Sequence, residues 1–252
     1  KPRLVILTYN GASSSKEKIA LVGKGVTFDS GGINLKTGDY ISTMRSDMAG
    51  AATVLATTLV AAQLKLKKNI VCLMPLVENM ISPDAYKPGD IIKAYDGTSV
   101  EVANTDAEGR LILGDTVAYA ERNIKPNIII DVATLTGSIM AALGEYVTGF
   151  VSNDDLISRK LLESGLRTYE RVWRLPIYDD YREEVKSDVA DIKNLAYKDG
   201  KYAGAITGGI LGAGTGAVSG YLNKRAAKSI DDAVDITRPK LTTKEQNRAF
   251  AS

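Results

Sequence analysis

The stretch Asn104–Leu111 reads NTDAEGRL and places charged side chains at intervals of two residues. On an extended segment this spacing puts Asp106, Glu108 and Arg110 on one side of the chain. Two close carboxylates repel each other unless a cation lies between them or one is protonated. A neighbouring guanidinium offers a planar fork for an anion. The pattern therefore indicates a metal site beside an anion site, and the alternative is a polar turn after a strand at Ser99–Val102.

A second polar cluster occupies residues 22–47, VGKGVTFDSGGINLKTGDYISTMRSD, and follows an apolar run that predicts a buried strand. Four of its charged residues are the candidates for a site: Lys24, Asp29, Lys36 and Asp47. The two clusters together resemble the catalytic domain of the leucine (cytosol) aminopeptidases, which are two-metal peptidases. The octapeptide is similar to that family's signature, and the first cluster matches in residue type, spacing and distance from it. The resemblance extends over roughly Lys1–Thr207.

The resemblance implies a centre that holds two divalent metal ions, zinc or manganese. Asp29 and Glu108 would bridge the two ions, and Asp106 would complete one site. Asp47 and the neutral amine of Lys24 would complete the other. A lysine can ligate only when it is deprotonated, which requires a strongly lowered pKa. Without the resemblance, the simpler interpretation of Lys24 is a salt bridge to one of these aspartates.

Two further basic residues have catalytic roles by the same resemblance. Lys36 would stabilise the oxyanion of the tetrahedral intermediate. Arg110 would hold a bicarbonate that acts as the general base, which compensates for the absence of histidine. The alternatives are a solvated loop lysine for Lys36 and an ion pair with a nearby carboxylate for Arg110.

The implied activity is release of N-terminal residues from peptides, preferably apolar ones, through a metal-bridging hydroxide. Four positions resemble the substrate-pocket residues of the family: Met44, Asn104, Thr134 and Gly137. An apolar Met near the metals suits a hydrophobic first side chain on the peptide. Packing is the alternative interpretation for Met44 and Thr134.

Composition excludes several other kinds of chemistry. The chain of 252 residues contains no histidine, so Ser-His-Asp catalysis and His-ligated zinc are excluded. The single cysteine, Cys72, lies in an apolar run and cannot form a disulfide within the chain. A formal net charge of +2 gives no reason to expect nucleic acid as a partner. We see no signal peptide at the start, and we expect a cytoplasmic protein.

Hydrophobic patterning predicts an α/β fold with a central, mostly parallel sheet flanked by helices. Apolar or β-branched runs predict strands, and longer periodic segments predict helices. Asp96-Gly97 predicts a hairpin turn within residues 90–102, and Asp154 predicts a helix cap. The expected strands are 4–8, 19–23, 69–76, 127–135 and 146–152, and the expected helices are 48–64, 111–124, 138–143 and 154–171.

The chain departs from the family pattern at both ends. We expect a catalytic domain at residues 1–207, truncated at its start, and a divergent glycine-rich helix with a polar tail at residues 208–252. Within Gly204–Gly220 glycine recurs every fourth residue, which is typical of close helix packing and allows membrane contact as a less favoured alternative. The family forms hexamers, so a homo-oligomer that acts on peptides is expected. The rival interpretation is a catalytically impaired remnant of the family that acts as a metal-binding, structural or membrane-associated protein.

Overall fold

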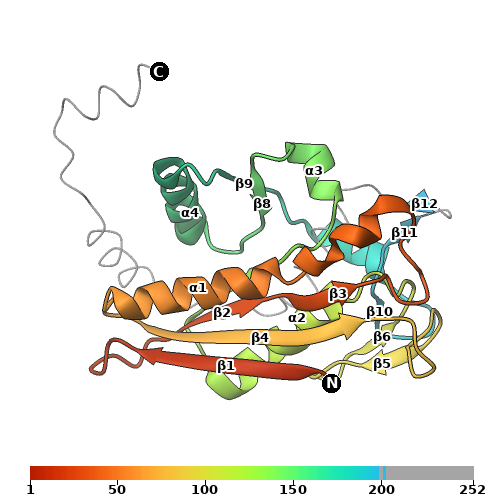
Figure 1. The fold of residues 1–252 in the computed structure, drawn as a ribbon, viewed down its shortest axis with the longest axis horizontal. Coiled ribbons are helices and arrows are strands. Elements are labelled where there is room, and N and C mark those ends of the chain that lie inside the picture. The colour runs from red at the N-terminus through yellow and green to blue at the C-terminus, as the bar shows by residue number, and fades with distance from the viewer. Residues whose placement is uncertain (199–200, 203–252) are drawn as a thin grey trace.

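A five-stranded mixed sheet forms the centre of the molecule in the computed structural model, which describes residues 1–198 and 201–202 (Figure 1). Four strands follow the order β1–β4–β2–β7, and β3 also pairs with β4. All the pairings are parallel except that of β1 with β4. The prediction of a mostly parallel sheet is therefore confirmed. The strands are β1 (Arg3–Asn10), β2 (Ile19–Gly23), β3 (Gly25–Asp29), β4 (Asn69–Asn79) and β7 (Ile128–Val132).

Two helices cover the opposite faces of this sheet. α1 (Ala49–Gln63) packs on the face that carries Leu21, Ile70 and Cys72. α2 (Gly109–Tyr119) packs on the face that carries Val22 and Leu73, and the π-helix η2 (Ala120–Ile124) continues it. Successive strand residues point to opposite faces, so a strand buried on both sides is apolar throughout.

Lys24 interrupts the sheet at the point where the site begins. β2 and β3 lie one after the other along the same side of β4, and Lys24 is the residue between them. Its amide N–H donates to the Val132 carbonyl at 3.0 Å, and its own carbonyl accepts from the Ala51 amide at 2.8 Å. The backbone of Lys24 is thus fixed by both β7 and α1.

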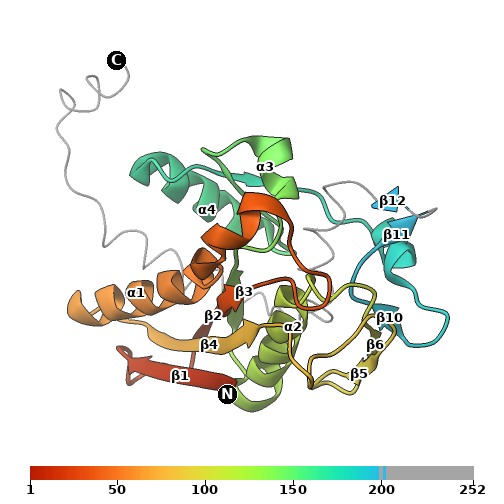
Figure 2. The same ribbon diagram turned by 45° about the vertical axis from the view of Figure 1, so that its right-hand side comes forward.

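The remaining elements form two groups, one beyond the end of the sheet at which the parallel strands finish and one above α1, on the side away from the sheet (Figure 2). The predicted hairpin is present, and a short strand from residues 192–193 joins it in parallel. Strands β8 (Thr148–Phe150) and β9 (Val172–Arg174) form a separate parallel pair. Along the chain, helix α3 (Ser138–Leu143) precedes β8 and helix α4 (Asp155–Thr168) follows it. The other elements are η1 (Gly38–Ser46), β5 (Ile91–Lys93), β6 (Ser99–Glu101), η3 (Asp179–Val185), β10 (Ile192–Lys193), β11 (Tyr197–Lys198) and β12 (Lys201–Tyr202).

Asp154 caps α4 as the sequence predicts, because its Oδ1 accepts from the Ile157 amide at 2.8 Å. We expect Asp154→Ala to lower the free energy of unfolding by about 1 kcal/mol, since the substitution leaves that amide without its partner. Urea denaturation measures the effect. Glu163→Ala, at an exposed position of the same helix, is the control and should change stability by less than about 0.5 kcal/mol. Equal effects of the two substitutions would argue against a capping role.

No helix within residues 1–198 and 201–202 is long and apolar enough to cross a membrane. The glycine-rich stretch Gly204–Gly220 and the polar tail lie outside the described residues, so the expectations for them stay predictions.

Candidate functional site

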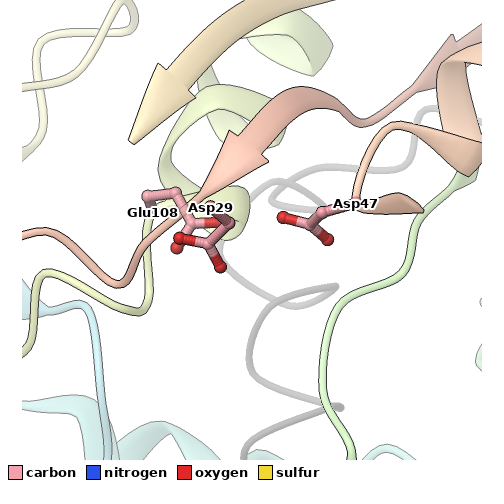
Figure 3. A group of neighbouring side chains, drawn as sticks. All are labelled: Asp29, Asp47 and Glu108. Atoms are coloured by element: carbon pink, nitrogen blue, oxygen red, sulfur yellow. The ribbon is translucent and has the colours of Figure 1, made fainter. Parts of the chain in front are cut away.

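Three buried carboxylates from three different elements meet at the end of the sheet (Figure 3). Asp29 ends β3, Asp47 follows η1, and Glu108 directly precedes α2. Their exposed fractions are only 3%, 5% and 5%. One oxygen of each carboxylate lies within 4.8 Å of the others. Because like charges repel strongly when buried, this arrangement favours cations close by or protonation of one carboxylate.

Lys24 supplies one of these cations. Its Nζ lies 2.9 Å from Asp47 Oδ1 and 3.1 Å from Glu108 Oε1. The same ammonium donates to the Thr134 carbonyl at 3.0 Å, and the Thr134 hydroxyl donates to Asp47 Oδ1 at 2.8 Å. The salt bridge that the sequence left open as the simpler interpretation of Lys24 is therefore present. The contact also places the lysine nitrogen directly among the proposed metal ligands.

Lys36 supplies the second cation and brings Asp106 into the cluster. Its Nζ lies 2.9 Å from Asp29 Oδ2 and 2.6 Å from Asp106 Oδ1. Burial alone would lower the pKa of the Lys36 ammonium, but its hydrogen bonds to Asp106 and Asp29 and the charges of both raise that pKa to about 12. Lys36 is therefore a charged group bound to carboxylates and differs from the solvated loop lysine of the alternative interpretation.

The two ammonium groups leave the carboxylates incompletely satisfied. Burial raises the pKa of Glu108 to about 7 although the charge of Lys24 opposes the shift. Burial likewise raises the pKa values of Asp47 and Asp106. Asp47 Oδ2 and Glu108 Oε2 are buried without a hydrogen-bond partner among the described residues. Oxygen ligands of this kind, with several negative charges, fit hard divalent cations.

Arg110 is a buried guanidinium with an exposed fraction of 7%. Burial lowers the pKa of the Arg110 guanidinium, although the negative charge of Glu108 opposes this shift. Its Nε and Nη1 have no hydrogen-bond partner, and it forms no ion pair, within the part of the chain that the structure describes. The ion pair with a nearby carboxylate, which was the alternative interpretation of Arg110, is therefore absent among the described residues. A buried, unpaired guanidinium suits a small planar anion.

All the predicted site residues except Glu108 line one cavity of about 860 Å³. The charged ones are Lys24, Asp29, Lys36, Asp47, Asp106 and Arg110, and the predicted substrate-pocket residues are Met44, Asn104, Thr134 and Gly137. The lining also includes apolar residues from α3 and the segment before β8: Ile139, Met140 and Val147. A cavity that combines charged groups with an apolar wall is suited to binding a small organic molecule or a chain end.

The conformation of the octapeptide differs from the sequence prediction. An extended segment was expected, but a turn at Thr105–Asp106 is followed by the first turn of α2. The Asn104 side-chain oxygen accepts from the Asp106 amide at 2.7 Å, which closes this turn. Asp106 and Glu108 therefore converge because the chain bends, and Arg110 lies on the helix. A spacing of two favours an extended segment, and the local pattern did not indicate the turn.

Patterning missed two buried asparagines that hold this turn and Asp29 in place. Asn79 Nδ2 donates to Asp29 Oδ1 at 2.9 Å and to the Thr105 carbonyl at 3.0 Å. Asn194 Oδ1 accepts from the amides of Ala103 and Asn104, and its Nδ2 donates to the Asn104 carbonyl at 2.7 Å. Asn79 is the last residue of β4, but the expected strand stopped at residue 76, so the sequence pattern did not mark it. Nothing in the local sequence links Asn194 to a loop about 90 residues earlier.

Comparison with known proteins gives the context of this site. Residues 1–212 match the family model described as "Cytosol aminopeptidase family, catalytic domain". The chain is 50% identical to a probable cytosol aminopeptidase of Chlorobaculum tepidum over 206 aligned residues. The alignment covers 82% of this chain and 40% of that protein. A probable cytosol aminopeptidase of Cenarchaeum symbiosum is 48% identical over 207 residues, 82% of this chain and 42% of that protein.

Solved structures agree with the sequence matches. A leucine aminopeptidase of Caenorhabditis elegans superposes with a TM-score of 0.77 at 36% identity, over 86% of this chain and 45% of that one. The bottromycin maturation enzyme BotP superposes with the same TM-score at 35% identity, over 87% of this chain and 46% of that one. The chain spans about two fifths of the length of the curated relatives that it matches. From its matched sequence and its fold, this chain belongs to the cytosol aminopeptidase family.

Proposed function

We propose that this chain carries the catalytic centre of a metal-dependent aminopeptidase that releases N-terminal, preferably apolar, residues from peptides. The observation that carries the proposal is the cluster of four carboxylates and two lysines, of which all but Glu108 line one cavity. Its buried, unpartnered carboxylate oxygens support a divalent cation as the missing partner. Membership of the family supports the reaction class.

The ligand set of two metal ions is the one that the family resemblance implies, and the contacts among these side chains support it. By that resemblance Asp29 and Glu108 would be shared by both ions, and one oxygen of each lies within 4.8 Å of the other. Asp106 would complete one site, and Asp47 with the neutral amine of Lys24 would complete the other. Zinc or manganese bound there would hold the amino terminus of a peptide, polarise the scissile carbonyl and acidify a water molecule.

The side chains around the ligands would perform the remaining steps. The Lys36 ammonium is positioned to donate to the developing oxyanion once it is released from Asp29 and Asp106. Arg110 would hold a bicarbonate as the general base, for which its Nε and Nη1 are suited because they have no hydrogen-bond partner among the described residues.

Around these groups, Met44, Asn104, Thr134 and Gly137 would contact the peptide. The apolar cavity wall supports a preference for an apolar first residue. The division into a catalytic domain at residues 1–207 and a separate segment at 208–252, the hexameric assembly and the cytoplasmic location stay predictions.

Hydrolysis of a leucine chromogenic amide by the purified chain, with added manganese or zinc, tests the proposal. We expect turnover that depends on the metal, disappears with a chelator and returns when metal is restored. The number of metal ions bound per chain is measured in the same samples. Metal binding without turnover would favour a catalytically impaired member of the family, and the absence of metal binding would reject the proposed centre.

We expect Asn194→Ala to weaken metal binding about 10–100-fold, because the Asn194 amide holds the loop that carries Asp106 and Glu108. Titration with manganese measures the dissociation constant. Asn123→Ala is the matched control, since the exposed Asn123 amide bonds only Tyr95 and Tyr119 in the described structure. Unchanged affinity in Asn194→Ala would show that the loop keeps its geometry without this clamp.

A further inference from the structure

The side chain of Lys24 lies directly against the first residue of α2. Lys24 is 3% exposed, and its backbone is fixed by the bonds to Val132 and Ala51. Its ammonium reaches Asp47, Glu108 and the Thr134 carbonyl only by running past Gly109.

Gly109 has no atom where any other residue would carry a Cβ. A Cβ at that position would lie 2.5 Å from Lys24 Cε, 2.7 Å from Lys24 Nζ and 3.0 Å from Lys24 Cδ. These are the three nearest atoms, and all belong to the lysine side chain. Gly109 is not among the glycines with positive φ, so its backbone conformation does not require glycine. What requires glycine at this position is the space that Lys24 fills.

We propose that Gly109 is a positioning residue that acts through Lys24: its missing side chain sets where the lysine nitrogen lies among Asp47 and Glu108. This inference rests on the proposed function, because it assigns Gly109 a role in metal binding. The ammonium contacts its partners at 2.9–3.1 Å, so a shift large enough to accommodate a methyl group breaks that geometry. A methyl group at Gly109 would therefore displace Lys24, one of the proposed ligands, whose atoms are the three nearest to it.

The fold should tolerate this methyl group. The atoms in its way are the flexible end of one side chain, and alanine is favoured over glycine within a helix. Gly50 shows the contrast, because a Cβ there would lie 2.1 Å from the Val132 carbonyl oxygen, which is fixed backbone. Substitution of Gly109 therefore separates an effect on the site from an effect on folding.

Gly109→Ala is compared with Gly114→Ala, which lies on the same helix and has nothing within 4 Å of its added Cβ. Manganese titration of each protein gives the dissociation constant. We expect Gly109→Ala to bind manganese about 10–100-fold more weakly than the wild-type protein, and Gly114→Ala to match the wild type. Wild-type affinity in Gly109→Ala would overturn the inference. A wild-type protein that binds no manganese would overturn the proposed function, and the inference with it.

A double-mutant cycle without metal shows whether the effect passes through Lys24. Thermal unfolding is measured for the wild type, Gly109→Ala, Lys24→Ala and the double variant. We expect Gly109→Ala to lower the unfolding temperature in the wild-type background and to leave it equal or higher in the Lys24→Ala background. Equal losses in both backgrounds would overturn the inference. If Gly109→Ala fails to fold, a folded double variant supports the clash with Lys24, and an unfolded one overturns it.

Discussion

Glu108→Gln is expected to reduce kcat/KM for a leucine amide by at least about 10³ and to lower the number of metal ions bound per chain. Glu108 is buried, and one of its oxygens lies within 4.8 Å of oxygens of Asp29 and Asp47. Glutamine keeps the shape but removes the negative charge, so the site loses part of what offsets the dehydration of a divalent ion. Elemental analysis of the dialysed protein gives the metal content alongside the rate.

Glu163→Gln provides the matched control for this substitution. It makes the same chemical change at an exposed position of α4, outside the residues that line the cavity. Rate and metal content should both stay at the wild-type level. A Glu108→Gln protein that keeps its metal and most of its activity would contradict the role of Glu108 as a shared ligand.

Lys36→Ala is expected to lower kcat by about 10²–10³ while the protein keeps its metal, because an oxyanion donor is lost and no ligand is removed. Lys36 contacts Asp29 and Asp106 in the structure, so its removal also frees oxygens that a metal ion can use. Metal affinity should therefore stay equal or increase. This combination separates Lys36 from Glu108, whose substitution removes metal and turnover together.

Lys87→Ala is the control for Lys36→Ala. The Lys87 side chain is 63% exposed and forms only a long surface contact with Asp90 at 3.6 Å in the described structure. It should have wild-type kinetics. Steady-state rates at several peptide-amide concentrations separate kcat from KM. A rise in KM alone for Lys36→Ala would place Lys36 in substrate binding and away from the oxyanion.

Much of the fold could be predicted because local pattern and tertiary environment agree. The apolar run at residues 19–23 reads as a strand buried on both faces, and Ala20, Leu21 and Val22 do pack against helices on alternate faces. Asp154 caps its helix through a bond that spans three residues. Such features depend on neighbours in the sequence, so the sequence contains the information needed to find them.

The convergence of the site was accessible only through the family resemblance. The residue types and spacing of the two clusters identified the candidate ligands, but composition and periodicity could not bring Asp47 to Lys24 or Asp106 to Lys36. Those contacts form because the segments that follow β3 and η1 and the segment that precedes α2 meet at one end of the sheet. Spacing also favoured the wrong conformation for the octapeptide, whose turn is stabilised by Asn104 and by the distant Asn194.

The sequence by itself determined the chemical character of this protein: a carboxylate-rich, histidine-free site on an α/β sheet, in a chain that resembles the cytosol aminopeptidases. Only the tertiary structure decided which lysine contacts which carboxylate, that Arg110 is buried without an ion pair in the described residues, and that Gly109 leaves room for Lys24. The physical reason is the range of the interactions. Backbone periodicity is set by near neighbours, whereas desolvation, ion pairing and steric fit depend on groups that only folding brings together.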